Sequence, residues 1–168
     1  SNTVQQQSAL FMSEANMPRR VLVIGSGAHT LVSSLLSFPV EHVTYVTEDN
    51  VFYDTALSFL SAQERVRLES VRYEHVNESV RRFLAETKQR YDLIIVYTNN
   101  PDSLMRNAFY TRQFYSLLDT VLVPEGVVVT RLTIGENYIT DAMKRVGESL
   151  VATVGSVFKK VLVLPGRE

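Results

Sequence analysis

The 168-residue sequence contains no cysteine and no tryptophan, and it has only three histidines. The absence of cysteine excludes disulfide bonds, thiol catalysis and cysteine-ligated zinc. No two of the histidines, His29, His42 and His75, stand at the spacing of ligands on one helix, so we expect no metal. The sequence also lacks an excess of either sign of charge. The formal net charge is -1 at pH 7, which argues against a nucleic-acid partner.

Long hydrophobic runs are missing as well. No apolar stretch reaches the roughly 20 residues that span a bilayer, and residues 1–7 lack the basic and apolar regions of a secretory signal. We therefore expect a cytoplasmic protein with no direct membrane contact by this chain, although the full gene could fuse it to a membrane segment. The composition is 45% hydrophobic and 21% charged, as in globular proteins, and the length fits one domain.

Short apolar runs alternate with longer amphipathic stretches along the chain. The apolar runs predict strands at residues 21–24, 42–46, 93–96, 127–129 and 161–164, with a further short strand within 66–73. Helices are expected near residues 30–37, 51–60, 111–121 and 141–154, and from residue 80 onward. Such alternation is typical of right-handed βαβ units. The predicted fold class is therefore α/β, with a doubly wound, mainly parallel, Rossmann-like sheet.

Doubly wound sheets bind ligands outside the carboxyl ends of their strands, so the residues that follow each strand are the site candidates. Gly25, Ser26 and Gly27 follow the first predicted strand. Glycines there permit a tight turn and a close approach of ligand to the main chain. A nucleoside-binding loop and a purely structural turn both fit this pattern. His29, in the same loop, is interpreted as a solvated histidine, with ligand contact as the alternative.

Polar residues also follow the second and third predicted strands. Glu48 and Asp49 come after the second strand. We favour Glu48 as the acid that binds ribose hydroxyls, and Asp49 as a helix cap or a second ligand. Asn77, Glu78 and Ser79 come after the third strand. They could contact the edge of an adenine, but capping of the next helix by Asn77 or Ser79 is the favoured interpretation.

The end of the fourth predicted strand is where an enzyme of this architecture would carry its reacting group. Tyr97 stands there, followed by Asn100 and Asp102 in a turn-forming segment. These three residues are the candidate catalytic groups. No carboxylate precedes Asp102 in this segment.

Five segments carry a resemblance to a known family. They are Arg19 to Gly27, Tyr91 to Val96, Asn107 to Tyr115, Leu122 to Val127 and Gly135 to Tyr138. Together they resemble the spermidine synthase family, the polyamine aminopropyltransferases. The Tyr-Thr-Arg-x-Phe-Tyr pattern at 110–115 is the most specific. The resemblance implies an S-adenosylmethionine-dependent methyltransferase-like fold over residues 19–168, preceded by a helical or extended lead-in at 1–18.

What the resemblance implies is a site for an adenosyl nucleoside, namely S-adenosylmethionine, its decarboxylated form or methylthioadenosine, without a metal. It also implies a polyamine substrate, since the family transfers an aminopropyl group to putrescine, and a homodimer. The attacking amine must lose a proton, so the chemistry needs carboxylates beside it.

The sequence departs from the family at the positions that matter for this chemistry. The family has aspartate directly after the fourth strand, where this chain has Tyr97, and the second acid of that loop is Asn100. The family usually has Glu-x-Asp at the end of its second strand. Thr47 takes the position of that glutamate, Asp49 keeps the aspartate, and Glu48 is displaced by one. We therefore expect impaired aminopropyl transfer. The alternatives are a methyltransferase acting on an unknown acceptor, and a non-catalytic binding or assembly domain.

Overall fold

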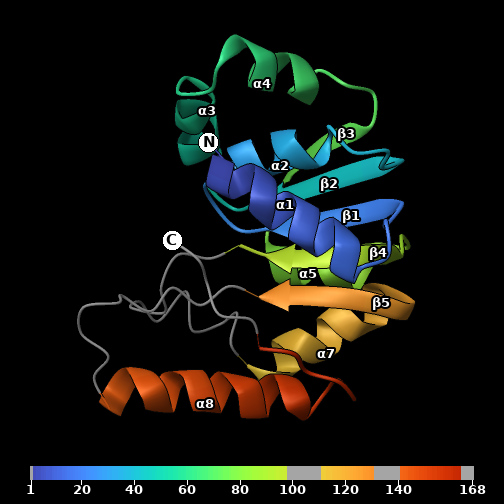
Figure 1. Cartoon of the computed structure of the whole chain (residues 1–168), viewed down its shortest axis with the longest axis vertical. Coiled ribbons are helices and arrows are strands. Elements are labelled where there is room, and N and C mark those ends of the chain that lie inside the picture. The colour runs from blue at the N-terminus through green and yellow to red at the C-terminus, as the bar shows by residue number, and fades with distance from the viewer. Residues whose placement is uncertain (1, 98–110, 131–140, 164–168) are drawn as a thin grey trace.

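The protein is described here by a computed structural model that places residues 2–97, 111–130 and 141–163 (Figure 1). Within these ranges one sheet contains five strands: β1 (Arg20–Ile24), β2 (His42–Thr47), β3 (Tyr73–Asn77), β4 (Tyr91–Val96) and β5 (Leu122–Thr130). Their order is β3-β2-β1-β4-β5, and all neighbours run parallel. The predicted parallel α/β sheet is confirmed. The strand order reverses at β1, which places the topological switch point between β1 and β4.

Helices cover both faces of the sheet. One face packs against α1 (Asn2–Glu14) and α2 (His29–Leu35), with α3 (Asn50–Leu57) and α4 (Ala62–Leu68) beside β3 (Figure 1). The other face packs against α5 (Val80–Glu86), α7 (Arg112–Val121) and α8 (Asp141–Gly155). In the part of the chain that is placed, no helix combines the length and the apolar character needed to cross a membrane.

Two hydrophobic clusters fill the space between the sheet and these helices. The α2-side cluster contains alternate residues of the central strands, such as Val23 and Ile95, packed on α2. The α7-side cluster contains the intervening residues, such as Leu22 and Ile94, packed on α5 and α7. This alternation follows from the period of two in a strand, and because both faces are covered the central strands are apolar throughout.

Two of the predicted strands are wrong. Residues 66–68, part of the stretch expected to hold the third strand, lie in α4, and β3 begins only at Tyr73. Ser61 and Glu64 form a capping box at the start of α4, in which each side chain bonds the other's backbone N–H. Residues 161–163, expected as a sixth strand, are exposed and form no strand. No placed strand runs beside them, and an isolated strand gains no ladder hydrogen bonds.

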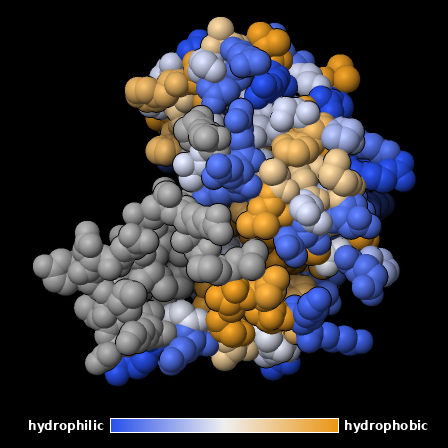
Figure 2. Space-filling model, viewed as in Figure 1, coloured by the Kyte–Doolittle hydropathy of each residue, from blue (hydrophilic) through white to orange (hydrophobic). Residues whose placement is uncertain are grey.

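The remaining boundaries differ only at their ends. Thr111 caps α7 as predicted, because its side chain accepts a hydrogen bond from the backbone N–H of Phe114. Strand β5 begins five residues before the predicted start and includes Glu125 in the left-handed region, at φ 64°. Its pairing with β4 shifts there, so that Tyr91 faces Leu122 but Leu93 faces Val127. Figure 2 shows a patch of apolar side chains in the lower middle of this view, below α1.

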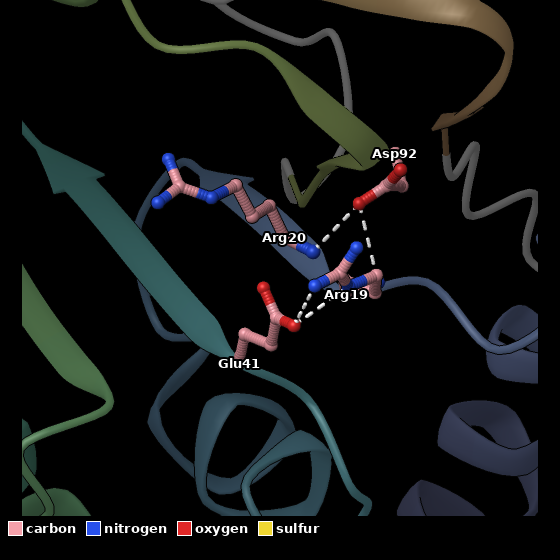
Figure 3. A network of polar contacts seen from close by, with 4 residues as sticks. All are labelled: Arg19, Arg20, Glu41 and Asp92. Carbon is pink, nitrogen blue, oxygen red and sulfur yellow. Dashed lines mark hydrogen bonds and ion pairs between the residues drawn. The ribbon is translucent and has the colours of Figure 1, made fainter.

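A polar network holds the amino-terminal edge of the sheet, opposite the predicted site (Figure 3). The Asp92 carboxylate accepts hydrogen bonds from the backbone N–H groups of Arg19 and Arg20, with N to Oδ2 distances of 3.1 and 2.7 Å. The Arg19 guanidinium also pairs with Glu41, just before β2. These contacts fix the start of β1 against β4 and β2. The strands whose carboxyl ends form the candidate site are therefore bonded to one another at their amino-terminal ends.

Candidate functional site

The loop after β1 is a tight glycine turn. Gly25 and Gly27 have φ angles of 119° and 81°, a conformation that side-chain-bearing residues rarely adopt. The Gly25 N–H donates to the carbonyl of Val46 at 3.2 Å, which anchors the turn to β2. A Cβ built on Gly27 would lie 3.7 Å from Cε1 of Phe52, so the Phe52 ring borders the turn. The predicted turn is confirmed, and Ser26 is exposed at its tip.

The three residues at the end of β2 have three different roles. Thr47 is buried, and its hydroxyl lies 2.8 Å from Nε2 of His75. Glu48 accepts a hydrogen bond on Oε1 from the backbone N–H of Val80 at 2.8 Å, so it caps α5 from a neighbouring strand end. Asp49 accepts from the backbone N–H of Phe52 at 2.9 Å, which confirms it as the cap of α3.

The end of β3 lies directly beside the end of β2. Asn77 pairs in register with Thr47 and is exposed, and the Glu78 N–H donates to the Thr47 carbonyl at 3.0 Å. Ser79 occupies the N-cap position of α5, but its side chain makes no capping hydrogen bond. The prediction that a serine or asparagine side chain caps this helix is therefore wrong. Glu48 supplies that oxygen instead, a contact between distant segments that local sequence patterns do not show.

The end of β4 is placed only as far as Tyr97. Its backbone N–H donates to the carbonyl of Ile24 at 2.8 Å, and its partly buried side chain packs against the α2-side cluster. Asn100 and Asp102, the other two candidate catalytic residues, lie outside the described residues.

His29 is not a solvated loop residue. It is the first residue of α2, only 3% of its surface is exposed, and neither ring nitrogen has a hydrogen-bond partner in the described structure. Its ring lies edge-on to Tyr45, with 5.5 Å between centroids, and tilted against Tyr53 at 4.6 Å. The prediction failed because α3 folds over the loop and covers it. The apolar residues Leu31 and Val32, two and three positions after His29, were the available signal for a buried helix start.

His29, Tyr53 and His75 form a histidine–tyrosine stack between α2, α3 and β3. The rings of Tyr53 and His75 are parallel within 4°, with centroids 3.5 Å apart. The Tyr53 hydroxyl also lies 2.9 Å from that of Tyr73. Next to the stack, the Tyr45 hydroxyl accepts a hydrogen bond from the backbone N–H of Ala28 at 3.1 Å. The sequence analysis missed this arrangement, because its residues come from four separate elements.

Burial changes the acid–base properties of the stack. It lowers the pKa of His29, while the Tyr53 backbone acts in the opposite direction and the nearby His75 lowers the pKa a little further. It also lowers the pKa of His75, while the Asp54 carboxylate acts in the opposite direction. Burial raises the pKa of the Tyr45 and Tyr53 hydroxyls. All four side chains are therefore held neutral near pH 7.

The carboxyl edge thus brings together a glycine turn, two carboxylates and an exposed amide from β1, β2 and β3. Such a set can accept hydroxyl hydrogen bonds and admit a ligand close to the main chain. No group of three or more metal-ligating side chains occurs among the residues that are placed. A separate pocket of about 340 Å³ lies at the opposite edge, between the end of α1 and residues 123–126.

The strand order and the turn after β1 define a Rossmann-like α/β domain of the methyltransferase-like class. Comparison with known proteins is more specific. Residues 7–164 match the model of the spermine/spermidine synthase domain, and the chain belongs to that family.

Relatives and solved structures agree with this assignment. The chain is 34% identical over 118 residues to polyamine aminopropyltransferase 2 of Hyperthermus butylicus, a match that covers 69% of this chain and 39% of the relative. A spermidine synthase solved in complex with the transition-state analogue AdoDATO superposes with a TM-score of 0.78 at 21% identity, covering 94% of this chain and 53% of that one. Human methyltransferase-like protein 13 in complex with SAH gives 0.64 at 20% identity, covering 95% and 70%.

The structural matches, at these identities, show the fold. The chain spans less than half the length of the curated relatives it matches, between 22% and 42% for the first four.

Proposed function

We propose that this chain is an adenosyl-nucleoside-binding domain that is impaired in aminopropyl transfer. The observation that carries the proposal is the contrast between two strand ends. The ends of β1 and β2 keep a glycine turn and two carboxylates. The end of β4 has Tyr97 where the family resemblance implies an aspartate. The ends of β1 and β2 suit a nucleoside, whereas the end of β4 does not suit a cationic amine.

Glu48 and Asp49 are the residues we assign to the ribose. Each uses one carboxylate oxygen to cap a helix, so a ribose hydroxyl would donate to the other oxygen. Thr47 is not available for this role, because its side chain is buried against His75. Asn77, Glu78 and Ser79, beside Glu48 on the next strand end, are assigned to the base. The neighbours' ligands, AdoDATO and SAH, are both of the adenosyl type that this site would take.

Tyr97 is the reason for proposing impaired transfer. Its phenol is a hydrogen-bond donor and acceptor and lacks the negative charge of a carboxylate. It can accept a hydrogen bond from an ammonium but cannot neutralise it or readily take its proton. General-base assistance contributes roughly 10²- to 10⁴-fold to a rate. Loss of the carboxylate at this position should therefore remove useful turnover with putrescine.

The binding half of the proposal is tested by thermal shift with S-adenosylmethionine, its decarboxylated form and methylthioadenosine. A ligand present at 100 times its dissociation constant stabilises the fold by about 2.7 kcal/mol. Glu48→Gln keeps an acceptor for the Val80 N–H but loses the charge, and it should reduce the shift. Glu41→Gln, at the opposite edge beside Arg19, is the matched control and should not. No shift with any of the three nucleosides contradicts nucleoside binding.

The catalytic half is tested by measuring product from putrescine and decarboxylated S-adenosylmethionine. We expect no appreciable product. A turnover of about 1 per second, at the slow end of enzymes, would contradict impairment. If Asp102→Asn then abolished that turnover, Asp102 would be the displaced catalytic carboxylate, with Asn100 in a supporting role.

Methyl transfer from S-adenosylmethionine to another acceptor is the second candidate function. It is favoured by the likeness to a methyltransferase-like protein bound to SAH and needs mainly positioning of the reactants.

A non-catalytic assembly role, in a cytoplasmic homodimer, is the third candidate function. Strand β5 lies at one edge of the placed sheet with half-buried valines, which is a surface for pairing. Light scattering that shows only a 19.0 kDa particle at high concentration would reject self-association.

A further inference from the structure

Two successive residues in the first turn of α3, Phe52 and Tyr53, connect the two parts of the proposed nucleoside site. These parts are the glycine turn after β1 and the carboxylates after β2. The Phe52 ring borders Gly27 of the glycine turn. The Tyr53 ring is the one buried side chain of α3 and enters the α2-side cluster. Asp49 caps the same turn. The placement of this turn therefore sets the position of Asp49, and of its neighbour Glu48, relative to the glycines.

Tyr53 is held between two histidine rings that come from different elements. His75 of β3 stacks on one side at 3.5 Å between centroids, and His29 of α2 packs against it at 4.6 Å. His29 is itself the second residue after Gly27. The histidine–tyrosine stack thus joins the segment after the glycine turn to α3 and to the strand that ends in Asn77.

We propose that the histidine–tyrosine stack is the positioning device of the nucleoside site, holding the first turn of α3 against the glycine turn only while both histidines are neutral. That the ligand is a nucleoside rests on the proposed function. The positioning itself is a property of the free chain. Tyr53 and the two histidines act through Glu48, Asp49 and the turn, not by contact with the ligand.

The surroundings of His29 explain why a proton would break the arrangement. Both ring nitrogens are shielded from solvent and make no hydrogen bond among the placed residues. The backbone of Tyr53 favours the charged ring, but burial opposes it more strongly, because burying an uncompensated charge is unfavourable. Among the placed residues, the hydrogen-bond partner of the His75 ring is the neutral hydroxyl of Thr47. Protonation would require a ring to leave the stack, and Tyr53 would lose its support.

The other titratable groups around the stack do not reverse this argument. Tyr45 and Tyr73 face it from β2 and β3 as neutral hydroxyls near pH 7. Asp54 of α3 attracts a charged His75, and a cationic imidazole over the Tyr53 ring gains some cation–π attraction. The pKa of each histidine is nevertheless lowered, so burial outweighs the Asp54 carboxylate at His75 and the Tyr53 backbone at His29.

The free chain is tested first, by NMR titration from about pH 8 to about pH 5, a range that brackets the unperturbed imidazole pKa of about 6.5. The backbone amide signals of Gly27 and Phe52 should move together with the titration of His29. This movement should disappear in His29→Phe, which keeps a ring but cannot be protonated, and diminish in His75→Phe. The matched control is His42→Phe, because His42 contacts Glu74 outside the stack and should behave as wild type.

Two results of the titration would overturn the proposal. One is amide movement that persists unchanged in His29→Phe and His75→Phe. The other is histidine protonation that occurs only with global unfolding, as seen by far-UV circular dichroism. His75 is partly exposed, so His75→Phe remains a valid test if His29→Phe does not fold.

Ligand affinity is the second test, measured by calorimetry with methylthioadenosine. Below the histidine pKa values, the dissociation constant of the wild type should rise by up to about tenfold per pH unit for each protonated histidine, because binding then requires the loss of that proton. At pH 7.5, Tyr53→Leu should weaken binding roughly tenfold if the competent position of α3 falls to a tenth of the population. Tyr53→Phe keeps the stack and should bind nearly as the wild type does.

The two tests separate this inference from the proposed function. If none of S-adenosylmethionine, its decarboxylated form and methylthioadenosine binds the wild type at any pH, the proposed function fails, and the titration alone decides the positioning role. If methylthioadenosine binds with an affinity that depends neither on pH nor on Tyr53→Leu, the positioning proposal is wrong and the proposed function stands.

Discussion

The two hydrophobic clusters on either side of the sheet differ in what they bury. The α7-side cluster is largely hydrocarbon, and its two buried tyrosine hydroxyls, on Tyr91 and Tyr115, each lie within hydrogen-bond distance of a threonine. The α2-side cluster borders the histidine–tyrosine stack, where His29 is buried without a hydrogen-bond partner among the described residues. The α7 side of the sheet therefore buries apolar groups and paired hydroxyls. The α2 side also buries polar atoms that lack a hydrogen bond within the described ranges, next to the candidate site, which is energetically unfavourable.

The difference follows the topology of the sheet. The glycine turn and α3 both lie at the carboxyl ends of β1 and β2, and the connections that follow these strands run on the α2 side. Buried polar groups without partners are rare, and those that persist near a site are candidates for function. The comparison therefore predicts that the α7-side cluster governs stability and that the stack governs the geometry of the site.

The largest effect is expected from a truncation in the α7-side cluster. Phe114 is fully buried in α7, so Phe114→Ala should cost about 3–5 kcal/mol of unfolding free energy. In contrast, His29→Leu removes two unpaired nitrogens at nearly constant volume. It should leave the unfolding free energy unchanged or raise it by up to about 1–3 kcal/mol, because an unsatisfied buried group costs that much. Urea denaturation of both variants measures the contrast, and equal losses would remove the distinction between the two clusters.

The Tyr45 hydroxyl gives the next largest effect. Tyr45→Phe keeps the ring but leaves the Ala28 N–H without its acceptor. An unsatisfied buried donor costs about 1–3 kcal/mol, so the urea midpoint should fall by a corresponding amount. Tyr91→Phe is the matched variant on the α7 side, where the hydroxyl is 3.4 Å from Thr44 and the loss should be smaller. A larger loss in Tyr91→Phe would contradict the special role of the glycine turn.

The pH dependence of stability separates the two clusters without any truncation. The pKa values of His29 and His75 are lowered in the folded state, so the unfolded chain binds more protons below the unperturbed imidazole pKa of about 6.5. The contribution of the two neutral histidines to the unfolding free energy is therefore fully present above about pH 6.5. It is lost as the pH falls through the folded pKa values. The slope cannot exceed about 1.4 kcal/mol per pH unit for each histidine.

Urea midpoints from about pH 8 to about pH 5 measure this slope. It should be smaller in His29→Leu than in the wild type and unchanged in Phe114→Leu, a substitution confined to the α7 side. A wild-type midpoint that does not fall in this range would show that the stack does not respond to protonation.

The fold was largely predictable from the sequence because its signals are local. Val21 to Ile24 and Leu93 to Ile95 are apolar without alternation, as strands buried on both faces require. The strand expected within residues 66–73 was wrong for an equally local reason. The capping box of Ser61 and Glu64 starts a helix there, and its signature stands in the sequence.

The candidate site was predictable only in its positions, not in its contacts. The turn at Gly25 and Gly27 and the cap at Asp49 follow from residues close in sequence. The bond from the Val80 N–H to Glu48 and the burial of His29 depend on elements brought together by the sheet. No periodicity or spacing of the chain encodes such contacts between distant segments.

The smallest predicted effect concerns the two helix caps beside the site. Asp49 accepts the Phe52 N–H, so Asp49→Ala should cost about 1 kcal/mol, the usual loss for a capping side chain. Ser79 stands at the equivalent position of α5 but makes no such bond, because Glu48 takes the Val80 N–H instead. Ser79→Ala should therefore cost close to nothing, although the sequence alone ranks the two substitutions as equal. If Ser79→Ala proved as costly as Asp49→Ala in urea denaturation, Ser79 would be the true cap of α5. Glu48 would then have both carboxylate oxygens free for a ribose, which strengthens the nucleoside assignment while removing the link between β2 and α5.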